Sequence, residues 1–306
     1  MADTNFIAPL FGMSITPATK NARLAFNLAQ VADSTKLDFL TMQDHPYNPT
    51  FLDTWTLLTA LGITTQHVRL LPNVANLPLR PPAMLAKEAA TLDILTNGRV
   101  EMGLGAGGFW DGIVSYGGPR RTPGEAVGAL EEAIQVMKAL WAPTSPGQAI
   151  SFEGKYYQLH SAQAGPTPQH PIGIWLGALR PRMLELTGRM ADGWIISAGY
   201  IPPEQVPSLQ TIIDEAAQRS GRAPAAIRRA YNLAGSIQRP GSSTITARRK
   251  GVLIGPVSQW ADALLQYYTN LRMDTFIFWP IGDEETQIRT FAEEVVPAVR
   301  SGLMSR

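Results

Sequence analysis

The chain has 306 residues, no cysteine, a formal net charge of +1 and 45% hydrophobic residues. The lack of cysteine excludes disulfides, thiolate metal sites and cysteine nucleophiles, and the near-neutral charge gives no basis for binding nucleic acid or an anionic membrane. No signal peptide is recognisable, and no apolar run reaches the ~18 residues that a membrane helix needs, so we expect a cytoplasmic protein without membrane contact.

Strand and helix patterns alternate through the first half of the chain. The sequence Thr122-Pro-Gly-Glu125 has the form of a capping box with proline at the first helical position, and Asp53 is placed to cap another helix. The expected strands are 6–15, 39–42, 68–71 and 100–104. The expected helices are 21–34, 53–64, 82–95 and 122–141.

The second half repeats this alternation with two interruptions. Residues 142–170 contain SFEGKYYQL and several prolines, which indicates an insertion with a small hairpin. Residues 238–251, QRPGSSTITARRKG, are typical of a mobile basic loop. The expected strands are 171–176, 193–197, 227–237 and 275–279. The expected helices are 182–190, 204–219, 256–270 and 284–299.

Eight strand–helix pairs in a chain of this length predict an α/β fold, a TIM (β/α)8 barrel with an insertion after its fourth helix. We interpret residues 1–306 as a single domain of this kind. A doubly wound open sheet is the competing interpretation.

A glycine-rich loop is expected after the fourth strand, within LTNGRVEMGLGAGGFWDG at 95–112. Gly103-x-Gly105-x-x-Gly108 matches the dinucleotide fingerprint, but that motif needs its third glycine at the start of a helix. The stretch that follows, FWDGIVSYGGPRRTPGE at 109–125, contains four more glycines and two prolines, which argues against that fingerprint. We expect a ligand-facing loop at the C-terminal end of the strand, the alternative being a loop that holds no ligand.

Several motifs together resemble the luciferase-like flavin oxidoreductases, a family that includes F420-dependent enzymes. The resemblance rests on LAKEAATLDILTNGRVEMGLGAG at 85–107 and covers most of residues 5–200, with a looser match over 250–280. Supporting segments are QDHPY at 43–47, LRPPAMLAKEAATLD at 79–93, GGPRRTPGEAVGALEEAIQVMKALW at 117–141, FEGKYYQL at 152–159 and LELTGRMADGW at 184–194.

The resemblance implies a TIM barrel that holds F420 or FMN at its C-terminal face. The ring of the cofactor would pack on a bulge after the third strand, where the matching dipeptide is Asn73-Val74 and a non-prolyl cis peptide is expected. An ordinary bulge is the alternative. Gly105, Ala106 and Gly107 would run along the ring or its side chain.

The resemblance also implies a phosphate site before the helix that begins near Pro181. Gly177 and Ala178 would offer backbone N–H groups to the cofactor phosphate, since a helix N-terminus favours an anion. Arg180 would add charge, or it is a surface arginine. Ser197, at the end of the sixth strand, is a further phosphate candidate.

His45 is the candidate catalytic residue, because the F420 dehydrogenases of the family place a histidine at the end of the second strand. An imidazole exchanges protons near neutral pH. Alternatively, His45 only contacts the ring or packs against Pro46 and Tyr47. Asp44 is counted among the cofactor-binding residues, with orienting His45 or capping the turn as its expected roles. The remaining histidines, expected at the surface, are His67, His160 and His170.

The substrate pocket is expected beside the glycine loop. Phe109 and Trp110 would line it, with packing in the core as the alternative, and Asp111 is a candidate polar contact. Trp194 is expected in the core. No metal site is expected.

Two departures from family patterns bear on the cofactor and the substrate. Gly108 stands where F420-dependent sugar-phosphate dehydrogenases carry a glutamate, and Ala106 stands where luciferase-related FMN monooxygenases tend to place an arginine. The second departure favours F420 over FMN. Arg120 and Arg121 would face a cofactor tail or be exposed.

We therefore expect an oxidoreductase that transfers a hydride between F420 and a small organic substrate. The alternatives are an FMNH2-dependent monooxygenase that uses O2 and a non-catalytic flavin-binding protein. A flavin or F420 reductase is a candidate partner. The family is commonly dimeric through its second and third helices, and residues compatible with either a dimer or plain barrel packing are Trp55, Leu57, Leu58 and Met84.

Overall fold

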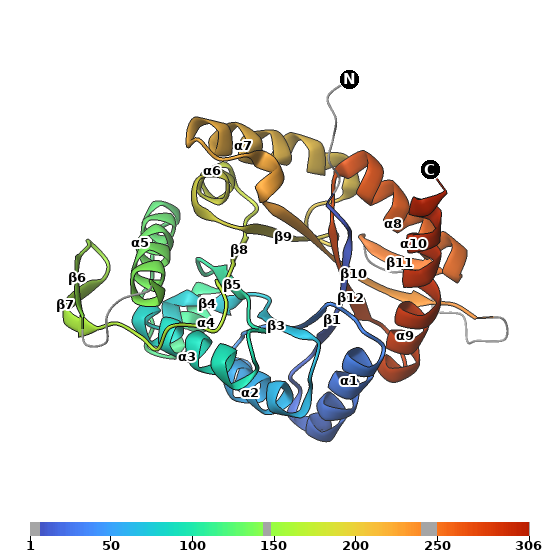
Figure 1. Cartoon of the computed structure of the whole chain (residues 1–306), viewed down its shortest axis with the longest axis horizontal. Helices are drawn as coiled ribbons and strands as arrows, with labels where there is room; N and C mark the ends of the chain where they lie inside the picture. Colours follow the sequence, from blue (N-terminus) through green and yellow to red (C-terminus); the bar gives the residue numbers. More distant parts are fainter. Residues whose placement is uncertain (1–6, 143–147, 240–249, 306) are drawn as a thin grey trace.

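The computed structural model describes residues 7–142, 148–239 and 250–305. Within them, nine parallel strands form a nearly closed barrel in the order β3-β2-β1-β12-β10-β9-β8-β5-β4 (Figure 1). The strands are β1 (Leu10–Ile15), β2 (Phe39–Met42), β3 (Arg69–Pro72), β4 (Ala75–Asn76), β5 (Met102–Gly105), β8 (Ile174–Gly177), β9 (Gly193–Ser197), β10 (Arg228–Ile237) and β12 (Thr275–Pro280).

Backbone hydrogen bonds close the barrel between β3 and the segment that enters β5. Leu70 N donates to Arg99 O over 2.8 Å, and Glu101 N donates to Leu70 O over 2.9 Å. This closure confirms the predicted barrel and excludes the open doubly wound sheet, which would leave two unpaired edges.

Helices surround the barrel, as Figure 1 shows. They are α1 (Ala22–Ser34), α2 (Thr54–Thr64), α3 (Pro82–Leu95), α4 (Trp110–Ser115), α5 (Pro123–Trp141), α6 (Pro181–Met190), α7 (Val206–Arg219), α8 (Val257–Leu271), α9 (Glu284–Thr290) and α10 (Val296–Met304). Two predicted caps are confirmed: the Asp53 carboxylate accepts from Thr56 N, and Thr122 and Glu125 form a capping box. The single helix expected over 284–299 is instead α9, a π-helical turn and α10.

Two elements were not predicted from the sequence. The helix α4 begins two residues after Gly108, inside the stretch expected to be loop, because its glycine-rich surroundings hide the helical pattern. The strand β11 (Val252–Gly255) pairs in parallel with β10 on the outside of the barrel. Most of the loop expected over 238–251 lies outside the described residues, so its mobility stays a prediction.

The insertion contains the expected hairpin, formed by β6 (Ala149–Glu153) and β7 (Gln158–Gln163). It projects away from the barrel beside α5 (Figure 1). The Glu132 carboxylate of α5 accepts hydrogen bonds from three successive N–H groups, those of Lys155, Tyr156 and Tyr157. This carboxylate ties the hairpin turn to the barrel wall.

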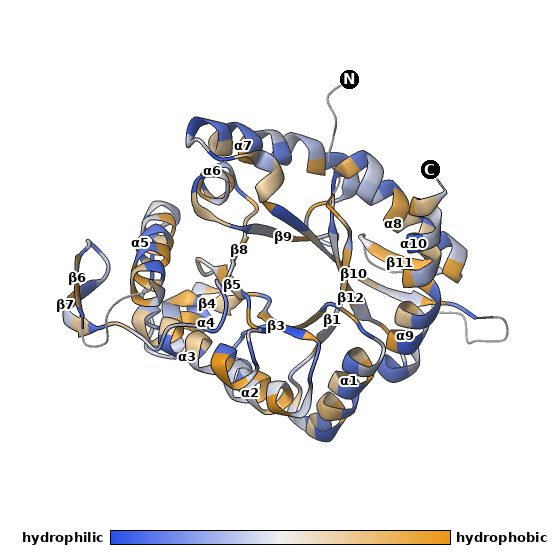
Figure 2. Ribbon diagram, in the orientation of Figure 1, coloured by the Kyte–Doolittle hydropathy of each residue, from blue (hydrophilic) through white to orange (hydrophobic). Residues whose placement is uncertain are grey.

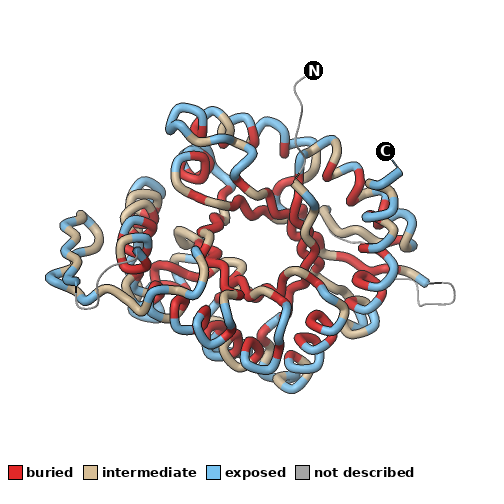
Figure 3. Tube along the Cα trace, viewed as in Figure 1, coloured by how far each residue is buried: buried red, intermediate tan, exposed pale blue. Residues whose placement is uncertain are grey.

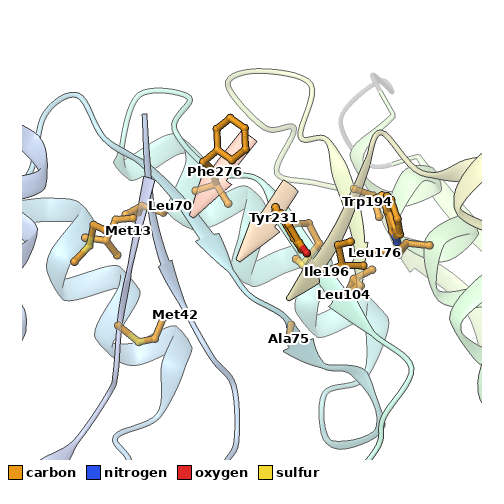
Figure 4. Packing of buried hydrophobic residues seen from close by; sticks show 14 of the residues in the cluster. Met13, Met42, Leu70, Ala75, Leu104, Leu176, Trp194, Ile196, Tyr231 and Phe276 are labelled. Carbon is orange, nitrogen blue, oxygen red and sulfur yellow. The ribbon is translucent and has the colours of Figure 1, made fainter. Parts of the chain in front are cut away.

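Apolar side chains fill the space between the strands and the surrounding helices. Buried residues follow the strands and the inner helix faces (Figure 3), while hydrophilic residues lie mostly on the outer helix faces (Figure 2). Met42, Ala75 and Leu104 are part of this layer (Figure 4). Trp194 is fully buried in it, which confirms the expectation.

The four residues considered for a dimer contact differ in their exposure. Trp55, Leu57 and Leu58 of α2 are buried within the chain, so barrel packing accounts for them. Met84 of α3 is 54% exposed and stays available for a dimer contact. In the described part of the chain, no helix combines the length and apolar character needed to cross a membrane.

Candidate functional site

The barrel interior carries an apolar layer and, above it, a polar layer. The apolar layer is a separate buried cluster with one residue from each of six strands: Phe39, Leu71, Trp175, Ile195, Ala230 and Ile277. Because side chains alternate along a strand, the next inward positions lie two residues further toward the C-terminal ends. Those positions are Thr41, Asn73, Gly177, Ser197, Asn232 and Trp279. This end of the barrel therefore has a floor of mostly small and polar side chains.

Hydrogen bonds join the polar groups of this floor. The Asn73 Nδ2 donates to Asn232 Oδ1 over 2.8 Å, and Asn232 Nδ2 donates to Ser197 Oγ over 3.1 Å. The Asn73 Nδ2 also lies 3.4 Å from Thr41 Oγ1. Asn232 is a site residue that the sequence analysis missed, although an asparagine between Tyr231 and Leu233 in a buried strand is an available signal. Ser197 belongs to the floor through Asn232, and its role as a phosphate ligand stays a prediction.

The Asn73–Val74 peptide is cis, as the resemblance implied. The side chain of Val74 lies against two of the predicted cofactor-binding glycines. A Cβ at Gly105 would lie 2.8 Å from Val74 Cγ2, and a Cβ at Gly177 would lie 3.2 Å from the same atom. These two glycines therefore make room for Val74 as well as for any ligand above it.

The other glycines of the loop differ in what a side chain would meet at their positions. A Cβ at Gly103 would lie 2.0 Å from Pro72 O, so this glycine permits close strand packing. Gly107 has φ +99°, a conformation that favours glycine. A Cβ at Gly108 would meet nothing within 4 Å.

His45 lies at the rim, just beyond the end of β2, with its side chain exposed. Its Nδ1 is 2.9 Å from the Tyr47 hydroxyl, whereas Nε2 has no hydrogen-bond partner among the described residues. The surrounding protein atoms lower the pKa of His45 by desolvation, and the negative charge of Asp44 acts in the opposite direction. The imidazole is therefore neutral at neutral pH, with one nitrogen free to meet a ligand.

Asp44 is held by protein groups on both carboxylate oxygens. It is 2% exposed, and it accepts from Arg80 Nε over 2.7 Å, from Arg80 Nη2 over 2.8 Å and from Asn76 N over 2.8 Å. Arg80 also donates to Asp53, the cap of α2, over 2.6 Å. Asp44 thus ties the loop that carries His45 to β4, which favours a supporting role over the predicted direct cofactor contact.

Arg80 is a second residue that the sequence analysis missed. Its two carboxylate partners raise the pKa of its guanidinium, against the effect of burial. It lies between β4 and α3, in the segment LRPP that contributed to the family resemblance. Its place in this segment could have marked Arg80 as a site residue, but the identity of its carboxylate partners depends on the fold.

A cavity of about 490 Å³ opens beside the glycine loop. The first turns of α5 and α6 border it, so the positive ends of two helix dipoles meet there. Arg180, at the N-cap of α6, is exposed and without an ion-pair partner in the described part of the chain. Its lining residues are Ala106, Gly107, Trp110, Pro123, Ala126, Val127, Arg180, Pro181, Arg182 and Met183. This arrangement suits an anionic group with an apolar neighbourhood, such as a phosphate tail.

Three of the predicted phosphate-site residues take distinct places. Ala178 is fully buried, and its carbonyl accepts a hydrogen bond from Trp194 Nε1 over 2.9 Å. Gly177 is half-buried beneath Val74. Arg180 lines the cavity and is exposed, so it is the member of this set whose charge is accessible from the cavity, and its contact with a phosphate stays a prediction.

The other two candidate arginines are engaged elsewhere. Arg120 forms an exposed ion pair with Asp111, so the substrate contact suggested for Asp111 stays a prediction. The Arg121 guanidinium lies between the rings of Tyr156 and Tyr157, at 5.7 and 5.6 Å from their centroids. Neither expectation of a cofactor-tail contact is supported by these contacts.

The two aromatic residues predicted for the substrate pocket lie in different places. Trp110 lines the cavity, whereas Phe109 is 56% exposed and packs edge-on against Tyr47 with ring centroids 5.2 Å apart. Phe109 therefore lies beside His45 through Tyr47. Neither side chain is in the buried core, which favours the pocket interpretation over core packing.

The three histidines expected at the surface are not alike. His67 and His160 are exposed, as expected. His170 is half-buried, and its Nδ1 lies 2.8 Å from Asp93 Oδ1 at the opposite, N-terminal end of the barrel. The expectation was wrong for His170, because the turn after α3 and the segment before β8 meet there. In the described ranges, no group of three or more histidine and acidic side chains is arranged for a metal ion.

Several solved structures have the same fold as this chain. A complex of an F420-dependent secondary alcohol dehydrogenase with an F420–acetone adduct superposes with a TM-score of 0.84 at 19% identity, over 96% of this chain and 100% of the other. The F420-dependent tetrahydromethanopterin reductase of Methanopyrus kandleri gives 0.80 at 20% identity, over 95% and 99%. The long-chain alkane monooxygenase LadA gives 0.81 at 14%, over 97% and 92%. At these identities the likeness shows the fold.

Sequence comparison identifies the family. The phthiodiolone/phenolphthiodiolone dimycocerosates ketoreductase of Mycobacterium tuberculosis is 36% identical over 197 residues, which are 62% of this chain and 47% of that protein. The chain thus spans about half the length of these curated relatives. The family model described as luciferase-like monooxygenase matches residues 6–243. The chain therefore belongs to the luciferase-like monooxygenase family.

Proposed function

We propose that this protein is an F420-dependent oxidoreductase that interconverts a secondary alcohol and a ketone. The single observation that carries the proposal is His45, a neutral imidazole at the rim of the polar floor whose Nε2 has no partner in residues 7–142, 148–239 and 250–305. The names of two similar proteins, a secondary alcohol dehydrogenase and a ketoreductase, support this substrate class.

The residues of this end of the barrel fit a flavin-type cofactor. Val74 and the Asn73–Asn232 pair present a small platform. Asn76 Oδ1 is buried and has no hydrogen-bond partner within the described part of the chain, so it could accept from a ring N–H. Arg180 and the N-terminus of α6 would hold a phosphate. When bound, F420 accepts or supplies a hydride.

His45 would handle the proton of the same reaction. In the oxidising direction, the substrate O–H bond breaks and its proton goes to Nε2, while the carbon loses a hydride to the cofactor. In the reducing direction, the Nε2–H bond of protonated His45 breaks as the substrate oxygen forms its O–H bond. A lowered pKa makes protonated His45 a better acid for this second direction.

Ala106 supports F420 over FMN, since it puts no charge where related FMN monooxygenases tend to carry an arginine. The alternative, an FMNH2-dependent monooxygenase supplied by a partner reductase, is favoured by the name of the family model and by likeness to an alkane monooxygenase. The cations at the cavity would serve the phosphate of either cofactor. A non-catalytic flavin-binding protein is the third candidate.

Titration with F420 and with FMN, followed by fluorescence quenching, tests the proposal directly. We expect F420 to bind more tightly and a panel of secondary alcohols to reduce it, with the absorbance of oxidised F420 as the readout. Oxygen consumption with reduced FMN would instead support the monooxygenase. Binding without turnover, unaffected by His45→Asn, would support the non-catalytic candidate.

A further inference from the structure

We propose that Ser197 binds the ring of the flavin-type cofactor: its hydroxyl donates a hydrogen bond to a carbonyl oxygen of that ring. This role rests on the proposed function for the identity of the ligand. It differs from the phosphate contact that the family resemblance implied for Ser197.

The hydrogen bonds of Asn232 determine how the Ser197 hydroxyl is used. Asn232 Oδ1 accepts from Asn73 Nδ2 over 2.8 Å. Asn232 Nδ2 carries two hydrogens, and it donates to Asn73 Oδ1 over 3.3 Å and to Ser197 Oγ over 3.1 Å. Both hydrogens of this amide are therefore used within the floor, and Ser197 is the acceptor of one of them.

Ser197 consequently has a hydrogen to give. A serine hydroxyl can accept hydrogen bonds and also donate its one hydrogen, and the Asn232 Nδ2 that faces it has no lone pair to accept that hydrogen. The residues that the structure describes include no acceptor to which the Ser197 hydroxyl donates. Ser197 is half-buried, so a ligand above the floor can reach it.

Ser14 is a second serine at this level of the barrel, and its environment is different. It is paired in register with Thr41, is 3% exposed and donates to Thr41 O over 3.4 Å. The hydrogen of Ser14 is thus used within the protein, and a ligand has no access to it. Of these two serines, Ser197 is the one that can donate to a ligand.

The strand register places Ser197 near the bulge that carries Val74. Gly177, whose missing side chain leaves room for Val74, is paired with Ile195 of β9. Ser197 is the next inward position of β9 toward its C-terminal end. Asn232 also links Ser197 to Asn73, the residue before Val74. A planar ligand that packs on Val74 therefore shares this part of the floor with Ser197.

Backbone hydrogen bonds fix the position of Ser197 on both sides. Its carbonyl oxygen accepts from Tyr200 N and from Ile201 N, each over 2.9 Å. Ala198 N donates to Asn232 O over 3.0 Å, which continues the pairing of β9 with β10 past Ser197. The hydroxyl is thus held in place by a rigid element, as a residue that binds a ligand precisely requires.

The cavity beside Arg180 is a different part of the site. Its lining comes from the glycine loop and from the first turns of α5 and α6, and Ser197 is not one of its lining residues. A cofactor whose phosphate lies in that cavity would meet Ser197 with another of its parts. Flavin and deazaflavin rings both carry carbonyl oxygens, which accept hydrogen bonds, so the free hydrogen of Ser197 is complementary to the ring.

Affinities for ligands with and without phosphate distinguish the ring contact from a phosphate contact. Fluorescence titration uses two pairs: F420 with the deazariboflavin that forms its core, and FMN with riboflavin. We expect Ser197→Ala to weaken both members of a pair by the same factor, about 2- to 10-fold, the size of one hydrogen bond. Ser197→Thr keeps the hydroxyl and should retain most of the affinity. A loss confined to the phosphorylated member overturns the proposal.

A vibrational measurement reports the contact itself. In infrared difference spectra of the bound phosphate-free ligand, Ser197→Ala should move one ring carbonyl band to higher frequency, because that oxygen loses its donor. Ser14→Ala is the matched control, since it removes a hydroxyl whose hydrogen is used within the protein, and it should change neither the bands nor the affinities. Weaker binding of Ser197→Ala with unchanged carbonyl bands would show a purely structural role and overturn the proposal.

Failure of this inference can be told apart from failure of the proposed function. Turnover of secondary alcohols with F420, together with unchanged affinities in Ser197→Ala, rejects the ring contact alone. The expected affinity loss and carbonyl shift without alcohol turnover reject the proposed function and leave Ser197 as a ring ligand. If no member of either pair binds, both proposals are rejected.

Discussion

Two histidines at opposite ends of the barrel experience opposite environments. At the C-terminal end, desolvation lowers the pKa of His45, whose Nε2 has no protein partner among the described residues. At the N-terminal end, the carboxylates of Glu101 and Asp93, which lie 3.8 and 2.8 Å from the ring nitrogens of His170, raise the pKa of His170. One end leaves a neutral group available to a ligand, and the other stabilises a charged group within the protein.

The neighbouring polar groups divide the two ends less sharply. At the N-terminal end, Asp93 is fully buried and accepts from the backbone N–H groups of Gln169, His170 and Val100. Arg99 there donates to four backbone carbonyls and to Thr65 Oγ1. At the C-terminal end, Asn76 Oδ1 and Trp279 Nε1 are buried without hydrogen-bond partners among the described residues, but so are His170 Nε2 and Arg229 Nε at the N-terminal end. Unpaired buried atoms therefore occur at both ends, and the exposed Nε2 of His45 is what distinguishes the end at which TIM barrels bind ligands.

The largest effect should come from His45 itself. We expect His45→Asn to lower kcat/KM with F420 and a secondary alcohol by about 10²- to 10⁴-fold, the usual contribution of a general acid–base group. Thermal unfolding should change little, because the side chain is exposed. A comparable activity loss in His170→Asn would break the comparison between the two ends.

Substitution of Arg80 should lower the stability of the protein, because this residue supports the structure of the C-terminal end. Arg80→Ala leaves the carboxylate of Asp44 buried without its cation, so we expect the free energy of unfolding to fall by about 3–5 kcal/mol. Urea denaturation measures this change. Arg120→Ala, which breaks the exposed pair with Asp111, is the control and should cost about 0–1 kcal/mol. Equal effects of the two substitutions would contradict a buried, supporting role for Arg80.

Substitution of Arg180 should weaken cofactor binding without changing the stability of the protein. We expect Arg180→Ala to weaken binding of F420 or FMN by roughly 5- to 10-fold, the size of one charge at a partly exposed helix N-terminus. The same substitution should not change binding of a riboflavin-type analogue that lacks phosphate. Equal losses for the two ligands would exclude a phosphate contact at Arg180.

The smallest effect should be the pH dependence of stability, with opposite signs at the two ends. The folded state binds the His170 proton more tightly than the unfolded state, so this stabilisation is present below pH ~6.5 and is lost as the pH rises through the folded pKa. For His45 the folded state binds the proton less tightly, so stability falls as the pH drops below ~6.5 toward the folded pKa.

Denaturation curves of His170→Asn and His45→Asn against the wild type, from pH 5 to pH 8.5, measure both signs. The stability difference between wild type and His170→Asn should shrink with rising pH. For His45→Asn, the acid-side loss of the wild type should disappear. The same sign for both variants would contradict the comparison.

The barrel was predictable because the sequence patterns that specify its strands and helices are local and repeat along the chain. Apolar runs such as 39–42 and 193–197 coincide with strands, and the capping box at Thr122 marks the start of α5. The helix α4 was missed because it is too short to show helical periodicity and is surrounded by glycines. One of its residues, Gly112, lies close to the ring of Tyr47, a contact that the local sequence does not encode.

The candidate site was predictable only in part. His45, the Asn73–Val74 bulge and the cavity beside Ala106 and Arg180 came from a family resemblance carried by several motifs. Asn232 and Arg80 were missed because their partners lie far away in the chain: Asn73 and Asn232 are 159 residues apart. No local pattern encodes such a pair.

The sequence by itself therefore determined the number and order of the strand–helix units, because hydrophobic periodicity and capping act over a few residues. The tertiary structure decided which end of each unit meets a ligand and which polar groups are left unpaired. Closing the barrel brings Asn232 under the bulge, Asp44 onto Arg80 and Tyr47 onto His45. Whether a polar atom has a partner depends on contacts that only the closed barrel creates.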